Sequence, residues 1–134
     1  MKFIDYKIHE ASFKLMPDAE PYKSYKINPK IGCNIKKGPE KILCTFTVEL
    51  KQTDHPIPFE FSITAVGAFS IENGEDANRL IVNVAETVYP FVRSSVSELT
   101  RMANIPPYVL PLLDMTELLH SCNNSSTPST TILC

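Results

Sequence analysis

The sequence lacks a hydrophobic run long enough to cross a membrane, and it has no basic segment followed by an apolar leader. The chain has 134 residues, of which 43% are hydrophobic, and this is enough for one domain with a sizeable core. We therefore expect one soluble domain over residues 1–120 that stays in the cytoplasm and does not insert into a membrane.

Signals of metal binding and catalysis are also missing. The four cysteines form no CxxC pair and no cysteine–histidine pattern, so we expect reduced thiols, two of them in the core, and no metal site. The sequence has no glycine-rich phosphate loop, no serine nucleophile elbow and no carboxylate pair in an apolar setting. We therefore expect no catalytic residue, no cofactor and no enzymatic activity.

Charges of one sign are not in large excess, because 15 acidic residues against 13 basic ones leave a net charge of −2. Six lysines gather between Lys23 and Lys41, where Glu40 is the only acidic residue. No aromatic ladder accompanies these lysines, so a solvated strand face or turn explains them better than a nucleic-acid site. We expect no nucleic-acid partner.

The run Ala77–Ala103 has the periodicity of one long amphipathic helix. Pro90 falls on its polar stripe, where water can satisfy the freed carbonyl, so we expect a helix that is kinked but continuous. The apolar sector is broader than one neighbouring element needs, which predicts contacts with two layers and assembly into a dimer or a dimer of dimers. We expect the oligomer interface to contain Ile81, Val84, Val88, Val92 and Leu99.

Four segments with apolar residues at alternate positions precede this helix and predict antiparallel strands. They are Met1–Leu15, Tyr25–Lys36, Glu40–Gln52 and Ile57–Ile71. The parity of the apolar residues changes within the first segment, which predicts a β-bulge near His9 and Glu10. The fourth segment would span about 50 Å if it ran straight, so we expect a bend near Gly67.

The segment Asn104–Asp114, here called the connector, contains three prolines that exclude both a helix and a central strand. Its other residues are too apolar for an exposed loop, so it must lie against another part of the molecule. Met115–His120 predicts a short helix, and residues 121–134 predict a disordered polar tail. The expected fold class is α+β, with a four-stranded antiparallel sheet followed by a long kinked helix and a short C-terminal helix.

Three motifs in this order resemble the SecB family of export chaperones. They are Gly67–Ile71 at the end of the fourth strand, Tyr89–Arg93 within the helix, and Ile105–Pro111 after the helix. The similarity spreads over residues 3–120. It implies a chaperone that holds unfolded polypeptides without ATP and assembles as a dimer of dimers, with the long helices between two sheets.

The resemblance also implies where clients bind. Members of the family use grooves in which the loop after the first strand and the loop between the helices meet the sheet. Mapped onto this sequence, the peptide-binding residues are Tyr22, Phe69, Ile71, Tyr108, Val109 and Leu110. Met102 is added as a flexible apolar wall.

Two features depart from the family pattern. The family docks on the export ATPase through an acidic sheet face, whereas here the outward positions Ser62 and Thr64 carry hydroxyls and the neighbouring strands carry lysines. Residues 121–134 contain no lysine or arginine, so the basic tail of many members has no counterpart. We therefore expect only weak docking on the export ATPase.

Three alternatives to a general export chaperone stay open. In the first, the chain is a dedicated SecB-like chaperone of an antitoxin, or a solitary or phage-encoded one. In the second, it is an oligomeric adaptor with one fixed partner, and the connector is only part of the interface. In the third, it is a thioesterase of the hot-dog type, which also wraps a sheet around a long helix, although that fold places its helix before most of its strands.

Overall fold

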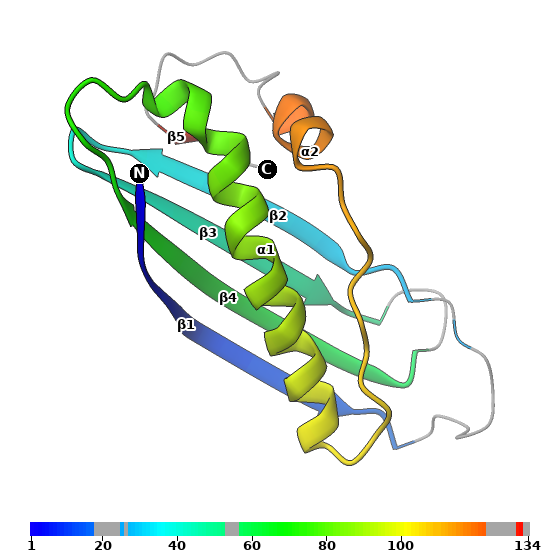
Figure 1. The fold of residues 1–134 in the computed structure, drawn as a ribbon. Coiled ribbons are helices and arrows are strands. Elements are labelled where there is room, and N and C mark those ends of the chain that lie inside the picture. Colours follow the sequence, from blue (N-terminus) through cyan, green and yellow to red (C-terminus); the bar gives the residue numbers. More distant parts are fainter. Residues whose placement is uncertain (18–24, 26, 53–56, 123–130, 133–134) are drawn as a thin grey trace.

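The computed structural model describes residues 1–17, 25, 27–52, 57–122 and 131–132 (Figure 1). It confirms the α+β class, with four long strands that precede a long helix and a short one. The elements are β1 (Lys2–Leu15), β2 (Lys30–Lys37), β3 (Lys41–Leu50), β4 (Phe59–Ser70), α1 (Ala77–Met102), α2 (Met115–Cys122) and β5 (Thr131–Ile132). None of the helices in the described residues is long and apolar enough to cross a membrane.

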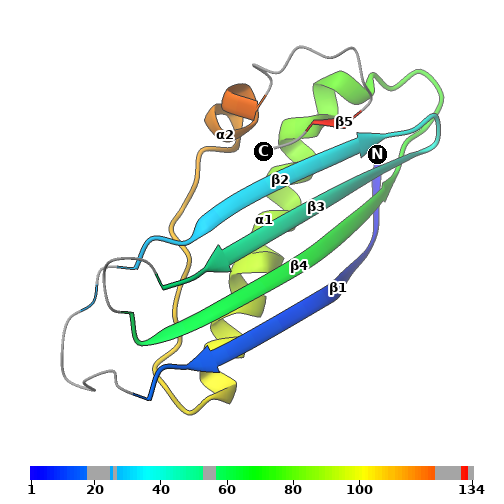
Figure 2. The same cartoon turned by 180° about the vertical axis from the view of Figure 1, so that it is seen from behind.

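The strands form one antiparallel sheet in the order β1-β4-β3-β2-β5. The first strand therefore pairs with the fourth, and β4 and β3 lie between β1 and β2 in the sheet. Helix α1 lies diagonally across one face of this sheet, and the connector runs beside it toward α2 (Figure 1). Seen from behind, the strands lie in front of both helices, so the helices cover only one face (Figure 2).

Strand β1 contains the predicted bulge, because its register against β4 shifts between Ile8 and Glu10. A second shift between Phe3 and Asp5 was not expected. Each shift moves the following residues to the opposite face of the strand. Apolar residues before and after His9 therefore point to the helix-bearing face, although their sequence parity differs.

Helix α1 is continuous through Pro90, which is exposed as expected. The carboxylate of Asp76 caps the helix by accepting a hydrogen bond of 3.0 Å from the backbone N–H of Asn78. The helix ends at Met102, and Asn104 adopts a positive φ of 61° that turns the chain into the connector.

The apolar stripe of α1 packs inside the chain. Val84, Val88 and Val92 are each 0% exposed in the single chain and belong to its core, and Ile81 and Leu99 are partly buried against that core. The three valines are therefore already covered and leave no surface for the interface predicted from the helix pattern. The sheet below the helix and the connector beside it together cover the apolar stripe.

Gly67 has a packing role that the sequence did not predict. The register of β4 with β1 and with β3 passes through Gly67 without a shift. A Cβ atom at this position would lie 2.4 Å from Cγ2 of Val88. Glycine at this point therefore allows α1 to approach the sheet closely.

Two other segments differ from the sequence expectation. Strand β2 begins at Lys30 and not at Tyr25, because Pro29 has no N–H for a strand ladder. Within residues 121–134, expected to be disordered, α2 extends to Cys122 and β5 pairs with Ile35 and Lys36 of β2. Pairing with β5 satisfies part of an edge that would otherwise expose unpaired backbone groups.

Candidate functional site

The connector is held against α1 by side chains of the helix. The hydroxyl of Tyr89 donates to the carbonyl of Pro111 at 2.6 Å, and Nε of Arg93 donates to the carbonyl of Leu110 at 3.0 Å. Burial raises the pKa of Tyr89 to about 12, so its hydroxyl stays a donor at neutral pH. Leu110 is 0% exposed, so the connector lies against the core as predicted.

Tyr108 is fixed through both of its backbone groups. Its N–H donates to Oγ1 of Thr100 at 2.8 Å, and its carbonyl accepts from Oγ of Ser97 at 2.9 Å. Thr100 is itself fully buried and donates to the carbonyl of Ser97 at 2.9 Å. One turn of α1 thus orders a proline-rich segment that has no helix or strand of its own.

The ring of Tyr108 packs on the beginning of β4. Its centroid lies 6.0 Å from that of Phe59 and 6.3 Å from that of Phe61. Burial raises the pKa of the Tyr108 hydroxyl. The next residue, Val109, is 57% exposed, so the connector presents one half-buried aromatic ring and one exposed aliphatic side chain in succession.

A cavity of about 460 Å³ lies where the connector meets β2 and α2, and we call it the connector groove. Its walls are Ile27, Asn28, Pro29, Ile31, Tyr108, Val109, Pro111, Leu113 and Leu118. None of these side chains is charged, and Asn28 is the only amide among them. The groove can therefore receive apolar side chains and offers few directional polar contacts.

The sequence assigned seven residues to client binding, and the structure places two of them in the lining of the connector groove. Tyr108 and Val109 line the connector groove. Phe69 and Leu110 are 1% and 0% exposed and belong to the core, because they face α1 or the sheet. Ile71 is half-buried, Met102 is 70% exposed at the end of α1, and neither is part of the groove lining. Tyr22 lies outside the described residues.

Sequence reasoning missed the wall formed by the residues just before β2 and by the start of β2. Ile27 and Ile31 were assigned to one strand because they alternate with polar residues. The signal that could have identified them is Pro29, which ends the ladder and leaves Ile27 outside the sheet. Leu118 was also missed, since a short helix does not reveal which of its apolar residues faces a groove.

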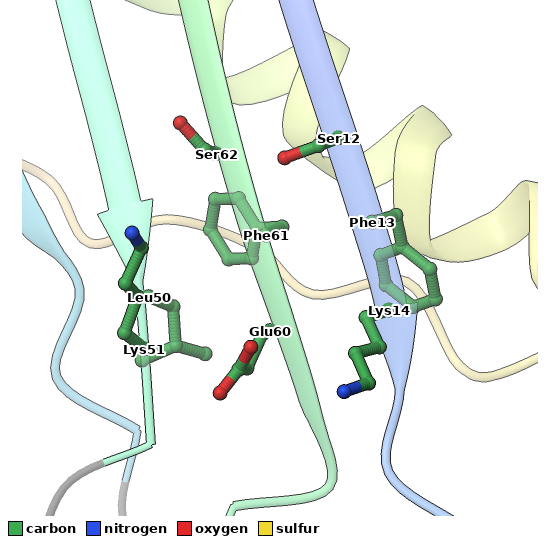
Figure 3. Close-up of a pocket in the computed structure, with 8 residues that line it drawn as sticks. All are labelled: Ser12, Phe13, Lys14, Leu50, Lys51, Glu60, Phe61 and Ser62. Atoms are coloured by element: carbon green, nitrogen blue, oxygen red, sulfur yellow. The ribbon is translucent and has the colours of Figure 1, made fainter.

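A second, smaller hollow of about 110 Å³ lies among β1, β3 and β4 (Figure 3). Its lining is Ser12, Phe13, Lys14, Leu50, Lys51, Glu60, Phe61 and Ser62. Lys14 stands opposite Glu60 in the register, and Glu60 accepts a hydrogen bond of 3.1 Å from the backbone N–H of Gln52. This hollow combines charges of both signs with apolar side chains, whereas the described lining of the connector groove carries no charge.

A second apolar surface follows β1 and the adjacent flank of α1. Phe91 is 44% exposed, and its ring stacks on Phe3 and Tyr6 at 5.5 and 5.3 Å. Ile8 and Leu15, also in β1, are 48% and 51% exposed. Among the described strands β1 is an edge, so this surface, here called the β1 surface, combines exposed apolar groups with unpaired backbone groups.

The described residues contain no cluster of three or more histidine, cysteine, aspartate or glutamate side chains that could hold a metal ion. Cys33 and Cys44 are buried free thiols whose Sγ atoms lie 3.8 Å apart. The hydrogen bond with Cys33 and burial raise the pKa of Cys44. The Cys44 thiol therefore stays protonated, and both cysteines are core residues, as expected for two of the four.

Comparisons of the sequence give one family and two relatives. A family model described as Preprotein translocase subunit SecB matches residues 5–125. An uncharacterized protein of Methanocaldococcus jannaschii is 27% identical over 127 residues, which cover 89% of this chain and 82% of that protein. Protein-export protein SecB of Orientia tsutsugamushi is 25% identical over 114 residues, which cover 80% of this chain and 71% of that protein.

The fold is similar to that of a SecB-like chaperone of Mycobacterium tuberculosis, solved in complex with a ChAD peptide from the HigA1 antitoxin. The TM-score is 0.67, and the similarity covers 84% of this chain and 90% of that one. The sequences are 17% identical, so this likeness concerns the arrangement of strands and helices.

Proposed function

The chain belongs to the SecB family, and we propose that it is a chaperone that holds unfolded polypeptides in the connector groove without ATP. The observation that carries this proposal is the groove itself, which has about 460 Å³ of space and no charged side chain among the described residues that line it. Pockets of roughly 300 to 1,000 Å³ with apolar walls are typical ligand sites. In this proposal the chain acts in the cytoplasm and needs no cofactor and no catalytic residue.

The chemistry of the groove suits many clients. Apolar walls gain free energy from any buried aliphatic or aromatic side chain, because this gain depends on area and not on direction. Val109 offers an exposed contact, while Tyr108 provides a ring that is already ordered by α1. A client therefore loses its own conformational freedom but does not have to order this wall.

We further propose that the chain forms a homodimer through the β1 surface, and that two such dimers can associate. The exposed Phe91, Ile8 and Leu15 would be covered by the β1 surface of a second copy, since a two-fold axis brings the same surface of both copies together. This surface replaces the buried valines of α1 as the proposed interface.

The client class is proposed as unfolded polypeptides in general, with an export role as one use. A dedicated role for an antitoxin is the second candidate, and the sheet face opposite the helices favours it. Lys30, Lys36 and Lys41 are exposed on this face, which also carries the hydroxyls of Ser62 and Thr64, with Glu49 between Lys30 and Ser62 in the register. A face of this kind does not match the acidic docking surface of export chaperones, so docking on the export ATPase should be weak.

The test measures binding of an unfolded protein, reduced and carboxymethylated α-lactalbumin. Val109→Asp places a charge in the groove wall and should weaken binding tenfold or more, since a buried valine contributes roughly 1.5 to 3 kcal/mol. The control is Leu112→Asp, because Leu112 is 83% exposed on the same connector and does not line the groove. Equal effects of the two variants would contradict the groove assignment.

A further inference from the structure

The sheet face opposite the helices, here called the bare face, carries more lysines than acidic residues. Its side chains alternate along each strand with those that point into the core, and residues that face each other across paired strands share one face. Among the described residues, seven lysines follow this pattern, against the four acidic residues Asp5, Glu10, Glu49 and Glu60. The bare face therefore has a formal charge of +3, although the whole chain has −2.

Four of these lysines have an acidic neighbour on the same face. Two of them form ion pairs, Lys7 with Asp5 at 3.7 Å and Lys51 with Glu49 at 3.8 Å. The other two face an acidic residue directly in the register, and they are Lys14, opposite Glu60, and Lys30, opposite Glu49. The charge along this part of the face is therefore largely balanced.

The remaining three lysines, Lys2, Lys36 and Lys41, gather at one end of the bare face, which we call the lysine end. Lys2 and Lys41 face Ser70 from its two sides, and Lys36 faces Leu43, the next bare-face residue after Lys41 on β3. Figure 2 shows the N-terminus, the end of β2 and the start of β3 together at this end of the sheet. All three lysines are exposed, and no carboxylate of the described residues lies within 4.0 Å of their ammonium groups. Their charges are therefore available to a ligand.

The spacing of the lysine end suits an extended polypeptide. Adjacent strands lie about 4.8 Å apart, so the Cα atoms of Lys2 and Lys41 are about 10 Å apart, and their flexible side chains can adjust to a ligand. The half-buried Ser70 lies between them, and Leu43 beside them is 38% exposed. Side chains on one face of an extended chain repeat about every 7 Å. Two or three carboxylates of one segment can therefore reach the ammonium groups while an aliphatic side chain covers Leu43.

We propose that the lysine end docks an acidic segment of a partner protein, in which carboxylates flank an aliphatic residue. The ammonium groups of Lys2, Lys36 and Lys41 meet the carboxylates, and the aliphatic residue packs on Leu43. The connector groove lies on the helix-bearing side of the sheet, so this surface is separate from the proposed client site. A partner docked here leaves that groove open.

The composition of the lysine end favours carboxylates over a nucleic acid. Its basic groups are all lysines, whereas the three arginines of the chain, whose planar guanidinium suits phosphate recognition, all lie in α1. The nearest rings, Phe3 and Phe69, pack on each other at 5.3 Å and face the helix side, where Phe3 stacks on Phe91 of α1. They offer no stacking surface for bases on the bare face. A longer polyanion would also run over the carboxylates farther along the face, beginning with Asp5.

The experiment measures binding of a labelled nine-residue peptide to the full-length chain by fluorescence anisotropy. Four aspartate or glutamate residues stand on each side of one leucine, and a matched peptide carries the corresponding amides. The acidic peptide should bind at least tenfold more tightly than the amide peptide. Raising the salt concentration from about 0.1 M to about 1 M should weaken its binding tenfold or more, because the screening length falls from about 10 Å to about 3 Å.

Two double variants locate the site. Lys36→Gln with Lys41→Gln removes two charges from the lysine end, and Lys14→Gln with Lys51→Gln removes two exposed charges from the balanced part of the same face. Both lower the net charge equally. The first should weaken binding of the acidic peptide about fivefold to tenfold, the effect expected for two exposed ion pairs, and the second less than twofold.

Three results would overturn the proposal. Equal effects of the two double variants would show that the peptide responds only to net charge. Failure of the acidic peptide to bind, or equal binding of the amide peptide, would show that the lysines are only solvated. A single-stranded DNA of nine nucleotides that binds more tightly than the acidic peptide, and that loses affinity with Lys36→Gln and Lys41→Gln, would replace the acidic polypeptide by a nucleic acid.

Discussion

The contact between Gly67 and Val88 determines how closely α1 lies on the sheet, and Gly67→Ala tests it. The added Cβ would lie 2.4 Å from Cγ2 and 3.3 Å from Cγ1 of Val88. Carbon atoms in favourable contact are about 3.5 to 4.0 Å apart, so the helix or the strand must move by about 1 Å. Val88 is 0% exposed, and a valine in a helix has one strongly preferred rotamer, so rotation of its side chain offers little relief.

The expected cost follows from two opposing terms. Overpacking a core by one carbon atom costs roughly 1 to 3 kcal/mol. Removing a glycine from the middle of a strand returns roughly 0.5 to 1 kcal/mol, because the unfolded chain loses freedom. Gly67→Ala should therefore lower the free energy of unfolding by about 1 to 2 kcal/mol. Val88→Ala alone should lower it by about 1 to 3 kcal/mol, because it leaves a cavity.

The decisive measurement is the double variant Gly67→Ala with Val88→Ala. The new Cβ would occupy part of the cavity, so the double variant should be more stable than the sum of the single effects by about 1 kcal/mol or more. Urea unfolding at several protein concentrations gives these values and separates any contribution from assembly. The control is Ser62→Thr, which adds a carbon on the bare face of β4 and should stay within about 0.5 kcal/mol. Additive effects, or a stable Gly67→Ala, would refute the close-approach argument.

Two further predictions concern the connector and the β1 surface. Thr100→Val should lower the free energy of unfolding by about 1 to 3 kcal/mol and weaken client binding, because it leaves the N–H of Tyr108 without its acceptor, whereas Thr100→Ser should retain both. Urea unfolding and binding of the unfolded α-lactalbumin test this, and equal behaviour of the two variants would contradict it. Ile8→Glu should shift the chain toward the monomer in light scattering, whereas Leu43→Glu on the bare face should not; a monomeric unmodified chain would count against the proposed dimer.

Local patterns predicted most of the elements of this fold. The alternation in β3 and β4 identified half-buried strands, and the parity change around His9 predicted a bulge that the structure confirms. These predictions succeed because the periodicity of a strand or a helix is set by its own backbone geometry. The bounds and continuity of α1 were also predicted from the sequence, since the N-cap Asp76 and the polar setting of Pro90 are local features.

The sequence predicted only part of the candidate site. The apolar character of the connector indicated that it packs against another element, and Tyr108 and Val109 do line the groove. The sequence did not show that Leu110 would be buried in the core, or that Ile27 would form the wall of the connector groove opposite the connector. Both depend on which segments meet across the molecule, and these segments are about 80 residues apart in the chain.

The sequence by itself therefore determined the order and type of the elements, the apolar character of the connector and the resemblance to a family. Tertiary structure alone decided which side of each apolar stripe remains exposed. The valines of α1 illustrate this, because their pattern predicted an interface but the sheet and the connector already cover them. Periodicity reveals that a face must be buried, whereas burial by the chain itself or by a partner depends on long-range packing.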